Sequence, residues 1–169
     1  VFMNLFHAPV WLLKIARMAR PGDNHTMQQR YDYIAEMTRR IIKRGRATIK
    51  VTGVEHIPEK DGFMLFPNHQ GLFDVLALFS TCPKALSVVI KKEASGWILV
   101  KQVLGATGSL AMDRKDMKDQ VRIIGEVTRL VKEGRNFVIF AEGHRSRKGN
   151  EILDFKSGTF KSAVKAGCP

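Results

Sequence analysis

The segment FVIF, residues Phe137–Phe140, decides the fold, because an apolar run without polar alternation is typical of a strand that is covered on both faces. Such strands belong to α/β proteins, in which helices pack on both sides of a mostly parallel sheet. Short apolar segments at residues 63–66, 86–90 and 109–112 carry the same signal. The sequence therefore predicts a mixed, mostly parallel central sheet flanked by helices.

Segments of helical pattern alternate with these strands. The clearest spans residues 27–44, where apolar residues recur at helical spacing until Gly45 ends the pattern. Further helices are expected at residues 73–80, 93–104, 116–133 and 156–166, and one more short strand at residues 47–52. We expect two parts: an N-terminal helical segment at residues 1–45 and an α/β domain at residues 46–169.

The charge of the chain points to an anionic partner. Lys and Arg outnumber Asp and Glu by 28 to 16 in 169 residues, a net charge of +12. Such a balance suits nucleic acid, a phosphorylated substrate or an anionic membrane. Nucleic acid is disfavoured, because aromatic residues are not interleaved with the basic ones and no nucleic-acid-binding motif is present. The two cysteines, Cys82 and Cys168, have no disulfide or metal-ligand spacing, which indicates a reducing, cytosolic environment.

The first thirteen residues, VFMNLFHAPVWLL, are mostly apolar and precede the basic residues Lys14, Arg17 and Arg20. A bilayer requires about 20 residues to cross, so this segment is expected to lie in the membrane interface, with Phe6 and Trp11 at headgroup depth. The protein would then be membrane-associated, on the cytoplasmic face. Two alternatives remain: a helix that packs on the protein's own core, or the end of a transmembrane helix.

A histidine and an aspartate follow the first sheet strand, in the segment FPNHQGLFDV at residues 66–75. A turn through Gly71 would let the Asp74 carboxylate fold back onto the His69 imidazole. The carboxylate would then fix the tautomer and leave the other ring nitrogen as a general base. The alternatives are that Asp74 only caps a helix and that His69 is an ordinary loop residue. No serine lies in a nucleophile-elbow motif, so the attacking group is expected to be a substrate hydroxyl.

Two arginines lie in the loops that follow the third and fourth strands. They are Arg114 in AMDRKD and Arg145 in FAEGHRSRKG. Functional groups gather at the carboxyl ends of parallel strands, and the guanidinium fork binds phosphate oxygens in pairs, so these loops are candidates for a phosphorylated acceptor. Glu142 would orient an arginine or accept a substrate hydroxyl, and Gly143 would let the backbone approach the ligand. Solvated surface charges are the alternative for both arginines. A metal site is disfavoured, because one His and one Asp are too few ligands.

The ordered motifs NHQGLFD, GSLAMDR and FAEGHRSR resemble those of the 1-acyl-glycerol-3-phosphate acyltransferase family, from about residue 51 to the end of the chain. The resemblance implies transfer of a fatty acyl group from acyl-CoA or acyl carrier protein to lysophosphatidic acid, giving phosphatidic acid, with no metal, cofactor or acyl-enzyme. It assigns His69 as general base with Asp74 as its partner. Arg114, Glu142, Gly143 and Arg145 match the acceptor-binding residues.

The third motif of this chain departs from the family pattern F-P-E-G-T-R-S. Ala141 and His144 replace its proline and threonine, and Gly71 stands where serine is commoner. These changes leave the charged groups in place but bear on the identity of the acceptor, which could be glycerol 3-phosphate or another lysophospholipid. A further family motif would start at Pro169, so the chain is expected to be truncated there. The alternative to an enzyme is a basic peripheral protein that binds anionic lipid without catalysis.

Overall fold

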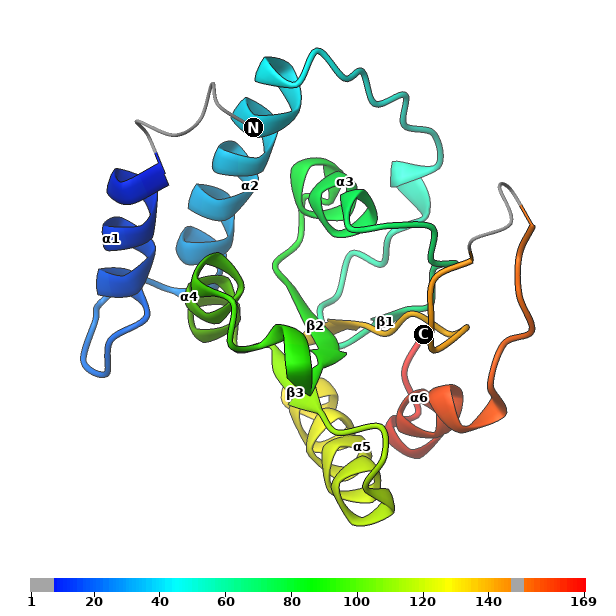
Figure 1. Ribbon diagram of the computed structural model, residues 1–169. Coiled ribbons are helices and arrows are strands. Elements are labelled where there is room, and N and C mark those ends of the chain that lie inside the picture. The colour runs from blue at the N-terminus through cyan, green and yellow to red at the C-terminus, as the bar shows by residue number, and fades with distance from the viewer. Residues whose placement is uncertain (1–7, 147–150) are drawn as a thin grey trace.

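The protein forms a parallel sheet between two layers of helices in a computed structural model that describes residues 8–146 and 151–169 (Figure 1). The elements in chain order are α1 (Ala8–Met18), α2 (Met27–Arg44), η2 (Val54–His56), β1 (Met64–Leu65), α3 (Phe73–Thr81), β2 (Leu86–Lys91), η3 (Lys92–Ala94), α4 (Ile98–Thr107), β3 (Leu110–Met112), α5 (Met117–Lys132), β4 (Asn136–Val138), η4 (Ser157–Phe160) and α6 (Lys161–Ala166). The expected α/β architecture is confirmed.

The sheet of the described residues has the strand order β1-β4-β2-β3, with every adjacent pair parallel. The strand order places the predicted segment FVIF in the interior of the sheet, because β4 pairs with both β1 and β2. The strand β4 itself spans Asn136–Val138, and the N–H of the following Ile139 still donates to the carbonyl of Leu65 at 3.0 Å. Because the strands are parallel, the loops after β1, β3 and β4 leave the same edge of the sheet.

Alternate strand residues face the two helical layers, as the two-residue period of a strand requires. Val88 and Val138 pack with residues of α1 to α4, whereas Val89 and Phe137 pack with residues of α5 and α6. Figure 1 shows α5 and α6 on one side of the sheet and α3 on the other. The strands are therefore buried on both faces, and this explains their unbroken apolar sequence.

The N-terminal helices belong to the same core as the sheet. Thr26 caps α2 through a capping box with Gln29, and Tyr31 and Ile34 of α2 are buried in the cluster that also contains Val88 of β2. Trp11 of α1 is only 7% exposed and joins this cluster. The expectation that Trp11 lies at headgroup depth is therefore wrong for this structure, whereas Phe6 lies outside the described residues. No helix in the described ranges is long and apolar enough to cross a bilayer.

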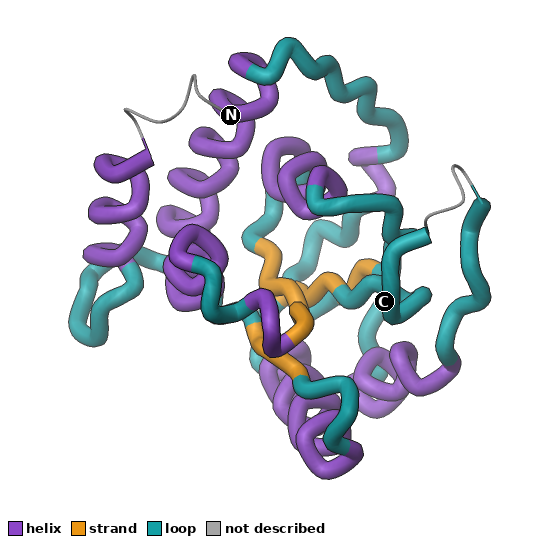
Figure 2. The backbone as a smooth tube through the Cα atoms, viewed as in Figure 1, coloured by secondary structure: helices purple, strands orange, loops and turns teal. Residues whose placement is uncertain are grey.

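Two sequence predictions fail in the loops. Residues 47–52 form no strand and run mostly exposed between α2 and η2 (Figure 2), because the segment has no partner strand to supply hydrogen bonds. The helix expected at residues 93–104 is divided: η3 comes first, and α4 starts only at Ile98, after Gly96 and Trp97. The free edge of β1 is partly occupied, since the Met64 N–H donates to the Pro169 carbonyl at 3.0 Å.

Candidate active site

His69 lies in the loop between β1 and α3, with its imidazole bonded to the Asp74 carboxylate. The distance from Nδ1 of His69 to Oδ2 of Asp74 is 2.7 Å, so the predicted pairing of these two side chains is present. The same Oδ2 accepts the N–H groups of Gln70 at 2.7 Å and Gly71 at 2.9 Å. Asp74 thus closes the loop at the start of α3 and orients the histidine at the same time.

These contacts define which ring nitrogen of His69 carries the proton. Burial by itself raises the pKa of Asp74, but the hydrogen bonds from the Gly71 N–H, the His69 ring and the Gln70 N–H outweigh it, so the pKa of Asp74 lies below its ordinary value. An ionised carboxylate can only accept hydrogen bonds. Nδ1 of His69 is therefore the donor in this pair, and Nε2 is the ring nitrogen that is not bonded to Asp74.

The loop after β4 and the segment that follows it form hydrogen bonds with the backbone of His69. Glu142 is fully buried and accepts the His69 N–H at 2.7 Å and the Leu153 N–H at 3.3 Å on its two carboxylate oxygens. The N–H of Ser146 donates to the His69 carbonyl at 2.7 Å. Phe140 stacks on the imidazole with a ring-centroid distance of 4.0 Å. His69 and the loop after β4 are thus joined by several contacts. The sequence analysis missed Phe140 and Ser146, because their contacts join segments about seventy residues apart in the chain.

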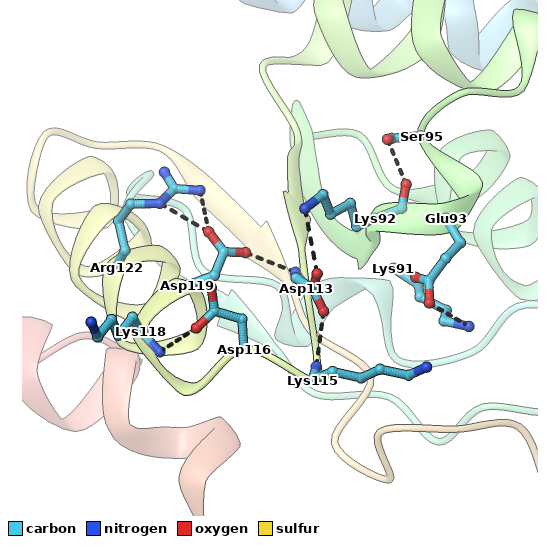
Figure 3. Close-up of polar contacts among 10 residues, drawn as sticks. All are labelled: Lys91, Lys92, Glu93, Ser95, Asp113, Lys115, Asp116, Lys118, Asp119 and Arg122. Atoms are coloured by element: carbon cyan, nitrogen blue, oxygen red, sulfur yellow. Dashed lines mark hydrogen bonds and ion pairs between the residues drawn. The ribbon is translucent and has the colours of Figure 1, made fainter.

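Arg114 is brought to the loop after β4 from the loop after β3. Its guanidinium donates to the carbonyl of Gly143, which has a left-handed φ of +73°. Asp113, which precedes Arg114, holds the loop after β3 in place. Its N–H donates to Asp119 at 2.8 Å and its carboxylate pairs with Lys92 at 3.4 Å (Figure 3). These contacts join the loop after β3 to η3 and to the first turn of α5, and so hold the segment that carries Arg114.

A cavity of about 930 Å³ opens next to His69 and extends between α2, α3, α4 and the sheet. Arg114, His144 and Arg145 lie at the same cavity as His69. Its interior is apolar and is lined by Ile34, Met37, Ile41, Val75, Leu76, Phe79, Val88, Ile90, Val100, Val103 and Leu104. In size and polarity the cavity suits a ligand with one anionic end and a long apolar chain.

The structure brings the candidate residues together but gives them different positions. His69, Arg114 and Arg145 line the cavity, and Asp74 lies behind His69. Glu142 and Gly143 are not among the described residues that line it, and their contact with an acceptor stays a prediction, as do the binding roles of the two arginines. No group of three His, Cys, Asp or Glu residues suited to a metal ion occurs in the described part of the chain.

The family model "Acyltransferase" matches residues 48–169, which is most of the chain and contains all the motif loops. The chain belongs to the acyltransferase family. It is 30% identical over 119 residues to the 1-acyl-sn-glycerol-3-phosphate acyltransferase of Borreliella burgdorferi, a match covering 70% of this chain and 47% of that protein. It is 35% identical over 104 residues to the Escherichia coli enzyme of the same name, covering 60% of this chain and 42% of that protein.

The human 1-acyl-sn-glycerol-3-phosphate acyltransferase alpha is similar over 122 residues at 28% identity, covering 72% of this acyltransferase and 43% of the human protein. The chain thus spans less than half the length of these curated relatives. The crystal structure of the 1-acyl-sn-glycerophosphate acyltransferase PlsC from Thermotoga maritima superposes with a TM-score of 0.74 at 23% identity, over 97% of this chain and 64% of that one. The family resemblance drawn from the motifs is confirmed, and so is the fold.

Proposed function

We propose that this acyltransferase transfers a fatty acyl group from a thioester, carried by coenzyme A or acyl carrier protein, to the free hydroxyl of lysophosphatidic acid. The observation that carries the proposal is the His69–Asp74 pair at the wall of an apolar cavity that Arg114 and Arg145 also line. The names of the curated relatives support the same acceptor. The cavity offers a place for an acyl chain directly beside the base.

The proposed reaction proceeds without a covalent enzyme intermediate. Nε2 of His69 removes the proton from the acceptor hydroxyl while that oxygen attacks the thioester carbonyl carbon. The new C–O bond forms, the C–S bond breaks, and His69 returns the proton to the leaving thiolate. Asp74 stabilises the imidazolium that exists between the two proton transfers. Arg114 and Arg145 bind the phosphate of the acceptor and hold its hydroxyl near the base.

The decisive experiment assays the full-length protein with radiolabelled acyl-CoA and lysophosphatidic acid. His69→Ala is expected to lower kcat by at least about 10³, in keeping with the size of general-base effects. His56→Ala is the matched control, because its side chain is 84% exposed on η2 and lies outside the cavity. Full activity of folded His69→Ala would disprove the mechanism.

Acceptor identity is tested with competing acceptors in the same assay. Lysophosphatidic acid, glycerol 3-phosphate and a lysophospholipid with a diester headgroup compete for one labelled donor. Arg145→Ala is expected to raise the KM for lysophosphatidic acid about tenfold or more, because a charge-assisted phosphate contact is lost. An unchanged KM would remove Arg145 from the acceptor site. Binding of anionic vesicles without any acyl transfer would favour the non-catalytic alternative.

A further inference from the structure

Three large apolar side chains lie at the cavity mouth. Leu72, Trp97 and Leu99 line the cavity and are also 58%, 55% and 41% exposed to solvent, so they lie where the cavity meets the surface. Leu72 precedes the first residue of α3, and the other two come from the start of α4. Ile98 lies between them in sequence and is 72% exposed without lining the cavity. We call Leu72, Trp97, Ile98 and Leu99 the apolar rim.

The remaining exposed residues of the mouth are cationic or imidazole groups. They are Lys91, Arg114, His144 and Arg145. None of the described residues that line the cavity is acidic. Glu93, two positions after Lys91, pairs with it at 3.0 Å. The mouth thus combines exposed apolar and exposed cationic side chains.

This combination is unusual for a surface that faces only water. Single exposed apolar residues are common, but several large ones at the mouth of one cavity indicate an interaction site. Tryptophan is enriched at membrane interfaces because its ring is amphipathic. Cationic side chains are attracted to the headgroups of an anionic leaflet. An apolar cavity whose mouth carries both apolar and cationic side chains fits a lipid surface, since a lipid presents an anionic head and an apolar chain.

We propose that the apolar rim inserts into the interface of an anionic phospholipid bilayer, so that the mouth of the cavity faces the membrane. The inference rests on the proposed function, because a lysophospholipid acceptor and its product would then pass between cavity and bilayer without crossing water. The surface differs from the apolar start of the chain: Trp11 of α1 is buried in the core, whereas Trp97 of the rim is exposed.

The chain supplies its own probe for this contact. It contains only two tryptophans, and since Trp11 is buried, a change of emission on vesicle binding reports mainly Trp97. Vesicles of equal parts phosphatidylcholine and phosphatidylglycerol are expected to shift the emission to the blue, and lipids brominated on the acyl chain are expected to quench it. Trp97→Phe should remove both signals and leave the emission of Trp11.

Ile98→Ser separates membrane contact from catalysis, because Ile98 lies on the rim but outside the cavity. The substitution is expected to weaken vesicle partitioning about tenfold, in line with the loss of one large apolar side chain from the interface. Val164→Ser is the matched control, since Val164 is 80% exposed on α6 and outside the cavity. Leu13 of α1 is 73% exposed, and Leu13→Ser tests membrane contact by the N-terminal segment separately.

Two assays distinguish failure of this inference from failure of the proposed function. Ile98→Ser should retain its activity toward a short-chain, water-soluble lysophosphatidic acid. Its activity toward an acceptor embedded in vesicles should fall about tenfold. If the wild-type protein acylates neither acceptor, the proposed function is wrong, whether or not vesicles change the emission of Trp97. An emission of Trp97 unaffected by vesicles, or shifted by protein concentration alone through self-association, overturns the rim proposal.

Discussion

The backbone N–H of His69 donates a hydrogen bond to the buried carboxylate of Glu142 at 2.7 Å, although the two residues lie 73 positions apart in the chain. This contact joins the loop after β1 to the loop after β4. The second oxygen of Glu142 accepts the Leu153 N–H, so one side chain joins three segments around His69. Glu142 is therefore in a position to act on catalysis through the placement of His69.

Glu142→Ala tests this placement. Removal of the carboxylate leaves the N–H groups of His69 and Leu153, both partly buried, without this acceptor, at a cost of up to about 1–3 kcal/mol for each donor. We expect a lower free energy of unfolding and a fall in kcat of about 10² with a smaller change in KM, because the base is displaced. Glu142→Gln keeps one acceptor oxygen and should restore part of kcat. If kcat is equally low in the Gln and Ala variants, the hydrogen bond from Glu142 to the His69 N–H does not determine kcat.

Asp74→Asn is expected to lower kcat by about 10³, since an amide does not stabilise an imidazolium as a carboxylate does. The variant should also change the acid stability of the protein. Because the pKa of Asp74 is lower in the folded chain than its ordinary value, the carboxylate stabilises the fold at pH values above about 4, and that contribution is lost as the pH falls through the folded pKa. Urea unfolding between about pH 6 and pH 3 should show the gap between wild type and variant narrowing below about pH 4. A gap independent of pH would exclude this role for the carboxylate.

Gly143→Ala addresses the loop that receives Arg114. Its φ of +73° is a conformation that L-residues rarely adopt, so we expect a loss of stability of about 1–2 kcal/mol. The added Cβ would lie 3.1 Å from the end of the flexible Lys156 side chain, which can move away. A shift of the Gly143 carbonyl would displace the Arg114 guanidinium, and the acceptor KM should rise. Gly125→Ala, in open space on α5, is the control and should stabilise by about 1 kcal/mol.

Arg135 directly precedes β4, at the end of the strands opposite the site loops, and tests whether that end affects activity. Its Nη2 lies 2.6 Å from Oγ of Ser87 and 2.9 Å from the carbonyl oxygens of Thr107 and Gly108, so it ties β2, β4 and the end of α4 together. Lysine lacks the planar fork, and Arg135→Lys should cost about 1–3 kcal/mol of stability. Neither kcat nor KM should change at temperatures where the variant is folded. A selective loss of activity would show that this end of the strands communicates with the site.

Much of the fold could be read from the sequence wherever local patterning and burial agree. The apolar strands, the helix of residues 27–44 and the loops that follow the strands all occur as expected, because a short apolar run with no polar face must be covered on both sides. The strand expected at residues 47–52 does not form, since strand pairing needs a partner that local sequence cannot supply. The helix expected from residue 93 starts only at Ile98, beyond Gly96.

The sequence by itself determined the chemical groups of the site: an imidazole and a carboxylate in one loop, and arginines in two others. Only the tertiary structure decided which of these groups meet, because their contacts join segments far apart in the chain. It placed Arg114 against Gly143, Glu142 beneath His69 and Phe140 against the imidazole. It also made helix α2 a wall of the cavity and left Trp97 exposed at its mouth. Long-range packing selects these pairings, and local sequence patterns carry no record of it.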